Sequence, residues 1–596
     1  MSIQIEELSF AYLNSPRQAL SDVTLTCPEG QVTAIVGPTG AGKSTLLLTL
    51  NGLVPKEIPG RLEGSISIDG INIRDVPTTQ LARNVVLMFE DPALQIVSLT
   101  VEEDIAFGPG NLGLPPEEIR KRVKEALARM RLKGYERRNP RFLSGGEQQL
   151  LALAGIIAMQ PKYIGMDEPV AMLDPIGKAQ VFRAVKELKE EGVSVIITDS
   201  GTDIQDLCAV ADQLVLLHKG RILATGTPGE IFKRRDLIEE VGLRIPQVTR
   251  VSWLLESDYN MKPAEDTVPT TIDECLAFVK NSLSHVKQDN NQYVDVIGSC
   301  DNSVRENGKS KSVEGDAEGD AAVIVRNLWH VFPGPPPVEA LRGIDLKVNR
   351  GEMLALIGQN GSGKTTLAYH LVGIHKPTNP DAQVIVDGVD VVHAPLTETI
   401  RHVNYVFQNP SNQLFCDTFG AEVAYGPSRL GFDAHEIEKR VNFALEQVGL
   451  GAYGEYSTFG MTRSIQGLLA LASIISMEPN VLIVDEPTGG LDYKASLRVL
   501  DVLRKLNETG VTVIIVTHDM ELVANYCHRV VVLKKGQLLL DGSPREVFSM
   551  PEVLEEAMVY PPQPTRLAQE LGHPLIPDHV LTVEELADAI GCLARR

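Results

Sequence analysis

Two glycine-rich stretches have the residue types and spacing of a loop that binds nucleotide phosphates. The first is Gly37-Pro-Thr-Gly-Ala-Gly-Lys43-Ser44-Thr45, and the second is Gly358-Gln-Asn-Gly-Ser-Gly-Lys364-Thr365-Thr366. Glycines let backbone N–H groups turn toward phosphate oxygens, the lysine reaches the terminal phosphates, and the hydroxyl can bind Mg²⁺. Each stretch follows an apolar run of strand type and precedes one of helix type, as the motif requires. The predicted nucleotide-binding positions are Gly37, Gly40, Gly42, Lys43, Ser44, Thr45, Gly358, Gly361, Gly363, Lys364, Thr365 and Thr366.

Downstream of each loop, an apolar strand ends in two carboxylates. The pairs are Asp167-Glu168 and Asp485-Glu486, and proline follows both. The first acid of a pair can hold Mg²⁺ or one of its waters, and the second can orient or deprotonate an attacking water. One such strand alone would be weak evidence. Two of them, each behind a phosphate loop, predict nucleotide hydrolysis.

A tandem duplication must position these groups, because every motif occurs twice in the same order. Within each copy strands alternate with helices, which predicts an α/β fold with a mostly parallel sheet. A helix-rich insertion is expected over residues 91–160 and again over 409–478. Each copy is followed by a shorter segment, and the two segments have similar sequences. The predicted units are a first nucleotide-binding domain (1–228), its C-terminal extension (229–286), a polar flexible linker (287–320), a second domain (321–547) and its extension (548–596).

Composition narrows the class of protein. The 596 residues carry a net charge of −22, which argues against a broad nucleic-acid surface, so no nucleic-acid partner is expected. The seven cysteines are scattered without a CxxC pair, which indicates a reducing cytosol and no structural metal. No apolar run reaches about 18 residues, the length that spans a bilayer, so any membrane role is expected to come through a partner.

One further stretch, Leu143-Ser144-Gly145-Gly146-Glu147-Gln148, lies before the first carboxylate strand and would start a phosphate-binding helix. With it the chain resembles the ATP-binding-cassette (ABC) ATPases. In that family this signature of one domain closes over ATP bound to the phosphate loop of the other. The resemblance implies that the two domains of this chain pair within the molecule and form two composite ATP sites.

The resemblance also implies roles for single residues in these sites. Tyr12 and Phe332 match the aromatic residue that stacks on adenine, and Asp174 and Asp492 match the acid of the loop after the catalytic strand. Gln408 matches the glutamine that senses Mg²⁺ and water, and His518 matches the switch histidine near the γ-phosphate. The implied Mg²⁺ ligands are Ser44, Asp167, Thr365, Gln408 and Asp485.

Departures from the family pattern all fall on one composite site. Glu90 stands where the second copy has Gln408, Asp199 stands where it has His518, and Met461-Thr462-Arg463-Ser464 replaces the signature. An ionised Asp199 about 4 Å from the γ-phosphate would cost about 4 kcal/mol at an effective dielectric of about 20. Arg463 could hinder the approach to phosphate or replace the lost contact. We therefore expect a first site (Lys43, Glu90, Asp199, Glu168) that holds nucleotide and a second (Lys364, Gln408, His518, Glu486) that hydrolyses it.

The stretch from Asp91 to Leu114 and its repeat from Asn409 to Pro427 closely resemble the ATPases of energy-coupling-factor (ECF) importers, which take up vitamins and transition-metal ions. That resemblance implies a membrane T component docked in this region, a separate substrate-binding S component, and a peripheral location on the cytoplasmic face of the membrane. Gln95 and Gln413 belong to this stretch, with a solvated helix face as the alternative. For Phe107 and Tyr425, core packing competes with partner contact.

Two other classes remain open at this point. One is the ATPase pair of a different ABC transporter, and the other is a soluble twin-cassette ATPase that acts on ribosomes or DNA. The acidic charge and the one-sided site losses disfavour the soluble class. The sequence does not identify the transported molecule, whose binding site would lie in another chain.

Overall fold

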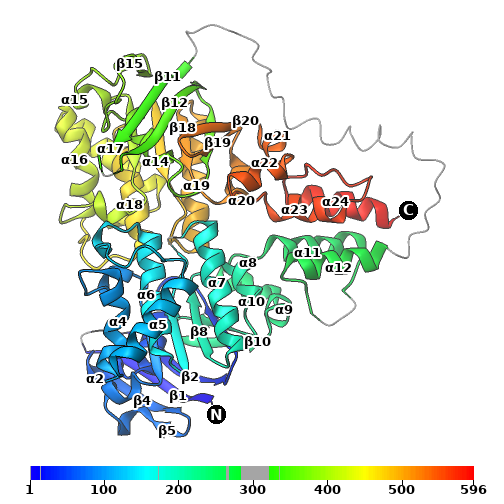
Figure 1. The fold of residues 1–596 in the computed structure, drawn as a ribbon. Coiled ribbons are helices and arrows are strands. Elements are labelled where there is room, and N and C mark those ends of the chain that lie inside the picture. The colour runs from blue at the N-terminus through cyan, green and yellow to red at the C-terminus, as the bar shows by residue number, and fades with distance from the viewer. Residues whose placement is uncertain are drawn as a thin grey trace.

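The computed structural model describes residues 2–13, 15, 17–171, 173–263, 267–283, 321–334 and 336–595. Its two copies are stacked on each other, and a group of helices from both copies projects from one side of the stack (Figure 1). The linker predicted for residues 287–320 lies outside the described residues. Among the residues described, no helix has both the length and the apolar character needed to cross a membrane.

The first copy is built on a six-stranded sheet in the order β10-β9-β3-β8-β7-β6. Its strands run parallel except for the edge strand β10. Register pairs Val36 with Asp199 and Asp167 with Thr198, so the strand ends that carry chemistry meet at one edge of the sheet. The strands are β3 (Val32–Val36), β6 (Val85–Met88), β7 (Tyr163–Asp167), β8 (Ser194–Asp199), β9 (Gln213–His218) and β10 (Arg221–Gly226).

A second, antiparallel sheet in the order β2-β1-β4-β5 was not predicted from the sequence. Its inward side chains, such as Ile3, Ile5 and Phe10, share a core with the helix that follows the phosphate loop. This sheet thereby fixes the phosphate loop from the side opposite the helical insertion. Its strands are β1 (Ser2–Tyr12), β2 (Leu20–Pro28), β4 (Gly60–Ile68) and β5 (Ile71–Asn72).

Helices cover the six-stranded sheet, and the predicted insertion over residues 91–160 is helical. Helix α6 brings the run Leu150–Ala154 into the main core. The helices are α1 (Lys43–Leu50), α2 (Leu53–Lys56), α3 (Thr78–Leu81), α4 (Val101–Asn111), α5 (Pro116–Arg129), α6 (Gly145–Met159), α7 (Pro175–Glu190) and α8 (Ile204–Cys208).

The second copy repeats this architecture, with sheets in the orders β16-β17-β18-β13-β19-β20 and β12-β11-β14-β15. Its strands are β11 (Ala321–Phe332), β12 (Val338–Asn349), β13 (Met353–Ile357), β14 (Gln383–Val386), β15 (Val389–Asp390), β16 (Val403–Val406), β17 (Val481–Asp485), β18 (Thr512–Val516), β19 (Arg529–Lys534) and β20 (Gln537–Gly542). Its helices are α14 (Lys364–Leu371), α15 (Leu396–Thr399), α16 (Phe419–Leu430), α17 (Ala434–Gln447), α18 (Arg463–Ile475), α19 (Tyr493–Glu508) and α20 (Met520–Tyr526).

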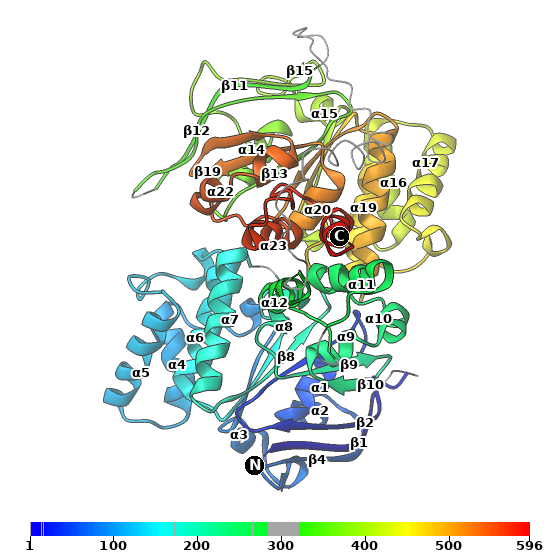
Figure 2. The same cartoon turned by 90° about the vertical axis from the view of Figure 1, so that its right-hand side faces the viewer.

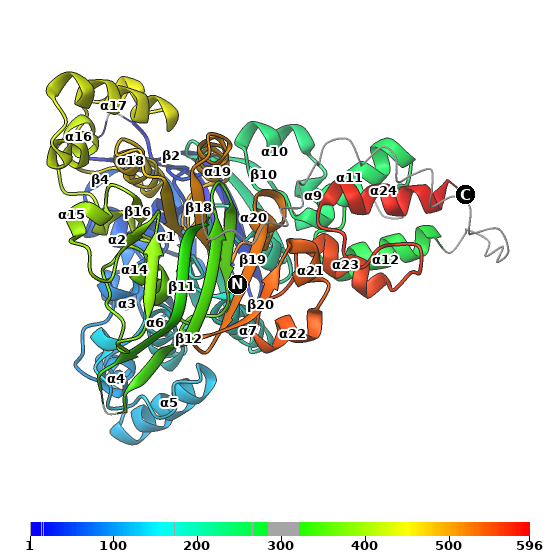
Figure 3. The same ribbon diagram turned by 90° about the horizontal axis from the view of Figure 1, so that it is seen from above.

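The two C-terminal extensions pack into one shared helical unit beside the stack (Figures 1 and 3). Val248, Val251 and Leu255 of the first extension lie in one apolar core with Leu586 and Ile590 of the second. Because burial of this core requires both extensions, it holds the two copies together. The helices of this shared unit are α11 (Gln247–Tyr259), α12 (Ile272–Leu283), α23 (Gln563–Leu571) and α24 (Val583–Ala594). The preceding helices α9 (Pro228–Phe232) and α10 (Arg235–Val241) pack in the core of the first copy, and α21 (Pro544–Phe548) and α22 (Pro551–Glu556) pack in that of the second.

Candidate functional site

Both phosphate loops have a backbone that requires glycine before the lysine. Gly42 and Gly363 have φ angles of 104° and 108°, a left-handed conformation that side chains disfavour. A Cβ atom at Gly42 would lie 2.5 Å from the Ala19 carbonyl oxygen, and one at Gly363 would lie 2.6 Å from that of Ala340. The loops therefore have the same strained shape in both copies.

The loop lysines are buried and point back into their own loops. Lys43 Nζ donates to the Gly37 carbonyl oxygen at 2.9 Å, and Lys364 Nζ donates to that of Gly358 at 2.6 Å. The adenine-stacking candidate Tyr12 lies beside the first loop, where its hydroxyl is 2.9 Å from Thr45 Oγ1. These short contacts show loops that are folded around the position a phosphate would take.

The glutamates at the ends of β7 and β17 have the same unusual backbone. Glu168 has a φ of 45° and Glu486 a φ of 48°. A non-glycine residue held at positive φ costs on the order of 1–3 kcal/mol and is typical of functional sites. Both copies thus keep the strained placement of the glutamate predicted to act as base, although other parts of the first site differ.

In the second copy Glu486 is enclosed by the switch residues. Its Oε2 accepts from Thr517 Oγ1 at 3.3 Å and from the His518 backbone N–H at 3.4 Å, and its Oε1 lies 3.1 Å from His518 Nε2. Burial, followed by the charge of Asp485, raises the pKa of Glu486 to about 8, while Lys364 opposes the shift. Burial also lowers the pKa of His518 to about 3, so its imidazole is neutral at pH 7.

The proposed Mg²⁺ ligands of the second site are oxygen donors that already lie together. Thr365 Oγ1 donates to Asp485 Oδ2 at 3.2 Å, and Gln408 lines the same cavity as Glu486. Mg²⁺ prefers oxygen ligands and usually keeps several waters beside one or two carboxylates and a substrate phosphate, so this donor set fits the ion. In the first copy, Ser44 is exposed at the start of α1 and Asp167 ends β7.

The first copy surrounds Glu168 differently. Ser200 Oγ donates to Glu168 Oε2 at 3.2 Å, and Lys43 Nζ lies 3.5 Å from Glu168 Oε1. Burial raises the pKa of Glu168 to about 7. Asp199 is buried and accepts from the Gly201 N–H at 2.5 Å, and burial together with neighbouring carboxylates raises its pKa to about 8. This environment favours the protonated form of Asp199, and its repulsion of a γ-phosphate stays a prediction.

The interface brings signature-position residues of the second copy to the first site. Arg463, the first residue of α18, places Nη1 3.8 Å from Glu90 Oε1 of the opposite copy. In the other direction, the Asn360 N–H of the second phosphate loop donates to Asp174 Oδ2 at 3.2 Å. Asp492 bonds within its own copy, to the Ala495 N–H at 2.9 Å. The two halves therefore meet head to tail, with α7 of the first copy next to the second (Figure 2).

The signature positions themselves begin two unlike helices. Ser144 caps α6, with its Oγ accepting from the Glu147 N–H at 3.3 Å and Glu147 bonding back to Ser144 N at 2.8 Å. Gly145 and Gly146 open the first turn of this helix. Thr462 caps α18 without a side-chain hydrogen bond among the described residues. Among the described residues, the hydrogen bonds of Ser144 stay within its own helix and none joins it to Lys364.

Gln95 and Gln413 support the loops that contain them. Gln95 accepts from the Phe89 N–H at 2.9 Å and donates to the Leu87 carbonyl oxygen at 2.8 Å. Gln413 Nε2 donates to the Ala470 carbonyl oxygen at 3.0 Å. A solvated helix face therefore describes neither glutamine. Phe107 and Tyr425 are 53% and 41% exposed, which rules out core packing for both.

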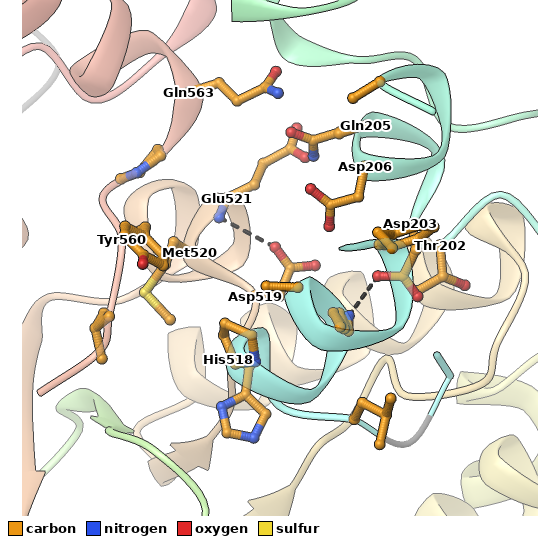
Figure 4. Close-up of a pocket in the computed structure, with 18 of the residues that line it drawn as sticks. Thr202, Asp203, Gln205, Asp206, His518, Asp519, Met520, Glu521, Tyr560 and Gln563 are labelled. Carbon is orange, nitrogen blue, oxygen red and sulfur yellow. Dashed lines mark hydrogen bonds and ion pairs between the residues drawn. The ribbon is translucent and has the colours of Figure 1, made fainter. Parts of the chain in front are cut away.

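A cavity of about 720 Å³ lies between the copies and reaches the second site. Figure 4 shows its wall, with Thr202, Asp203, Gln205 and Asp206 of the first copy and His518, Asp519, Met520 and Glu521 of the second. Arg244 also lines it and was not singled out from the sequence. The only sequence signal for Arg244 was its position in the stretch that the two extensions share, where the second copy has tyrosine.

Comparison with known proteins gives consistent matches. The family described as ABC transporter matches residues 20–171 and 341–489. A protein of Caldanaerobacter subterraneus subsp. tengcongensis that carries an ABC transporter ATP-binding name is 36% identical over 100% of this chain and 99% of its own length. One of Methanosarcina acetivorans with the same kind of name is 38% identical over 96% of this chain and 90% of its own. Among solved structures, cbiO1 of Clostridium perfringens, described as part of the ABC transporter complex cbiONQ, is 33% identical over 40% of this chain and 94% of its own, with a TM-score of 0.36.

Proposed function

The chain belongs to the ABC transporter ATPases, and from that premise we propose that it is the fused ATPase subunit of an ECF-type importer for a vitamin or a transition-metal ion. ATP hydrolysis by two tandem ATP-binding domains follows from the family. The type of importer, the membrane partners and the division of work between the two sites are our proposal. The observation that carries it is a pair of preformed apolar loops, one on each copy.

We propose that hydrolysis takes place at the second composite site. Lys364 and the N–H groups of its loop hold the phosphates, and the neutral imidazole of His518 donates a hydrogen bond to the γ-phosphate. Glu486 takes a proton from a water whose oxygen attacks the γ-phosphorus, the bond to the bridging oxygen breaks, and ADP leaves with the electron pair. Bound Mg²⁺ would neutralise phosphate charge beside Thr365, Gln408 and Asp485.

The first composite site would bind ATP without comparable turnover. It lacks the histidine donor, because aspartate stands at position 199 and one of its oxygens accepts from the Gly201 N–H. Its glutamine position carries Glu90, whose pKa burial raises, followed by the charge of Asp167. Arg463 lies near Glu90, where its charge can partly compensate for the extra carboxylate.

The apolar loops lie beside the glutamine position of each copy, next to the start of the helical insertion. In the first copy Leu94 is 73% exposed and Leu99 is 71% exposed, and in the second Phe415 is 64% exposed. Exposed apolar side chains that cluster in this way are typical of a protein–protein contact. The exposed apolar residues of the two loops and of the helices that follow are Leu94, Val97, Leu99, Phe107, Phe415 and Tyr425.

Buried carboxylates hold these loops in shape before any partner binds. Asp104, on α4, accepts from two backbone N–H groups of the preceding loop, both at 2.9 Å. Glu422, on α16, does the same at 2.9 and 2.7 Å. Because the loops are pre-organised, binding of a helical membrane protein would lose little conformational entropy there.

Affinity purification from detergent-solubilised membranes of the native cell tests this proposal. We expect the tagged chain to retain an integral membrane T component and a smaller S component in fixed ratio. The double variant Phe107→Ser/Tyr425→Ser should lose both, because it removes an exposed apolar side chain from the helix that follows each loop. The control Ile71→Ser changes an exposed apolar residue on β5, outside the loops, and should keep both partners.

Other results would favour the alternatives. Retention of a membrane protein of a different architecture would indicate another type of ABC transporter. Salt-sensitive retention of RNA or DNA without any membrane protein would indicate a soluble twin-cassette ATPase, since phosphate contacts weaken with salt. In either case the ATPase assignment of the chain would stand, and the importer proposal would be wrong.

A further inference from the structure

We propose that Arg244 is a positioning residue that couples the two composite sites by joining the switch loop of the first copy (residues 199–203) to that of the second (residues 517–521). Arg244 lies in the first extension, between α10 and α11. Its guanidinium bonds to Thr202, Asp519 and Glu521, which belong to the two switch loops. The inference rests on the proposed assignment of hydrolysis to the second site and adds a route by which the first site controls it.

The guanidinium of Arg244 holds the second switch loop through two carboxylates. Its Nη2 lies 3.1 Å from Asp519 Oδ1 and 2.6 Å from Glu521 Oε2, and its Nε donates to Glu521 Oε2 at 3.1 Å. Asp519 is the residue after the switch histidine, and it also caps α20 by accepting from the Leu522 N–H at 3.2 Å. Arg244 therefore fixes the point at which the switch loop enters its helix.

A short path of hydrogen bonds leads from this ion pair to the base of the second site. The Asp519 N–H donates to Thr517 Oγ1 at 3.0 Å, and Thr517 Oγ1 donates to Glu486 Oε2 at 3.3 Å. A shift of Asp519 would thus be transmitted to the groups that orient Glu486. Reaction rates depend steeply on such placement, and a misplacement of about 1 Å can cost about 10²-fold.

The same guanidinium also contacts the first switch loop. Arg244 Nη1 donates to the Thr202 carbonyl oxygen at 3.4 Å. Thr202 Oγ1 is 3.3 Å from Ser200 Oγ, which in turn donates to Glu168 Oε2 at 3.2 Å. The contacts from Glu168 to Glu486 therefore form one continuous chain, with Arg244 at the boundary between the copies.

The second copy has no equivalent of this link among its described residues. The extensions are related by reciprocal bonds, in which Gln563 accepts from the Val248 N–H at 3.2 Å and Gln247 accepts from the Gln563 N–H at 3.1 Å. This pairing matches Arg244, three residues before Gln247, with Tyr560, which is 52% exposed. The link therefore runs through the first extension only. It leads to the second composite site, which is the one proposed to hydrolyse ATP.

The ion pair between Arg244 and the two carboxylates of the second switch loop is largely buried. The Arg244 side chain is 13% exposed, with Asp519 at 19% and Glu521 at 14%. Burial alone would raise the pKa of Asp519, but the charge and hydrogen bond of Arg244 hold it below its usual value. Removing one partner of a buried pair leaves the other charge uncompensated, so the loop would have to rearrange when Arg244 is lost.

Steady-state ATPase kinetics of the full chain test the positioning role. Arg244→Ala should lower kcat about 10- to 100-fold while KM for MgATP stays within about twofold, because placement and not binding is lost. Arg244→Lys keeps the charge and should recover part of kcat. The matched control is Arg250→Ala, which also removes an ion pair with Glu521 but contacts neither Asp519 nor Thr202, and should keep parental kcat. Melting temperatures of all variants separate unfolding from positioning.

A double-mutant cycle tests the coupling. Lys43→Ala empties the first site and should lower kcat of the parent about tenfold at saturating MgATP. In the Arg244→Ala background the same change should lower kcat by less than about twofold, because the link is already broken. Each of four results would overturn the inference. They are losses of kcat that multiply in the double variant, no effect of Lys43→Ala on the parent, parental kcat in folded Arg244→Ala, and an equal loss of kcat in Arg250→Ala. Glu486→Gln in the same assay checks the underlying assignment, and a loss of kcat of less than about tenfold there would contradict the proposed function instead.

Discussion

In both composite sites a buried lysine, a strand that ends in Asp-Glu and a glutamate at positive φ occupy the same places. The sites differ in the side chains around those groups. The second encloses Glu486 with Thr517 and His518, whereas the first holds Glu168 with Ser200 and fills the switch position with buried Asp199. The parts that we propose to bind phosphate are thus duplicated, and the parts that we propose to orient the attacking water are not. Binding and hydrolysis can therefore diverge on one scaffold.

The strongest test of this difference between the two sites is to replace Glu486 and Glu168 in turn. Glu486→Gln should abolish ATP hydrolysis, with a loss on the order of 10²–10⁴ in kcat, because the amide cannot accept the proton from water. Glu168→Gln should leave kcat within about twofold at saturating MgATP, since this change leaves the first site able to hold nucleotide and hydrolysis there is not expected to contribute to turnover. Phosphate release at steady state measures both. Equal losses would mean that both sites hydrolyse ATP.

The pH dependence of kcat/KM should also distinguish the two sites. In the nucleotide-free chain the pKa of Glu486 is raised to about 8, so at lower pH the carboxyl is protonated and cannot act as base. Since kcat/KM reports the ionisation of the free enzyme, we expect it to rise by up to about tenfold per pH unit below pH 8 and then to level off. The same profile should persist in Glu168→Gln. A profile that changes with Glu168 would place the titrating group in the first site.

Much of the site could be predicted from the sequence because its parts are local. A phosphate loop or an Asp-Glu strand end lies within about ten residues and keeps its spacing, so Lys43 and Glu486 could be identified directly. Arg244 and Asp519 are a different case, because 275 residues separate them and only the fold brings them together. Neither the helix pattern of the extension nor its repeat indicates that contact.

The antiparallel sheet and the burial of Asp199 were missed for related reasons. Strand β1 is readable from its alternation, but its pairing with β2 and β4 depends on segments far along the chain. The sequence shows that an aspartate replaces histidine, but not that the carboxyl is buried. Burial decides whether it is ionised, and the buried position of Asp199 favours the protonated form.

Stability against pH gives a smaller and independent test of that protonated group. The folded pKa of Asp199 is about 8, above the value of about 4 in an unfolded chain. The folded state binds this proton more tightly, so the carboxyl destabilises the fold progressively as pH rises from about 4 to about 8. Asp199→Asn cannot ionise and should melt a few degrees higher than the parent at pH 8, with the difference shrinking toward pH 5. A constant difference would show that Asp199 is ionised throughout.

The smallest expected effect concerns Arg463, the residue that the second copy contributes to the first site. Its guanidinium lies 3.8 Å from Glu90 with both side chains partly exposed, and such pairs contribute about 1 kcal/mol or less. Arg463→Ala should therefore weaken ATP binding at the first site by about fivefold or less. Equilibrium binding in the Glu486→Gln background measures it without turnover, and Arg463→Ala/Glu90→Gln should restore most of the affinity because the uncompensated carboxylate is gone. Tighter binding in Arg463→Ala would instead show that the arginine obstructs the phosphate, and the first site would then be weakened by bulk and not by charge.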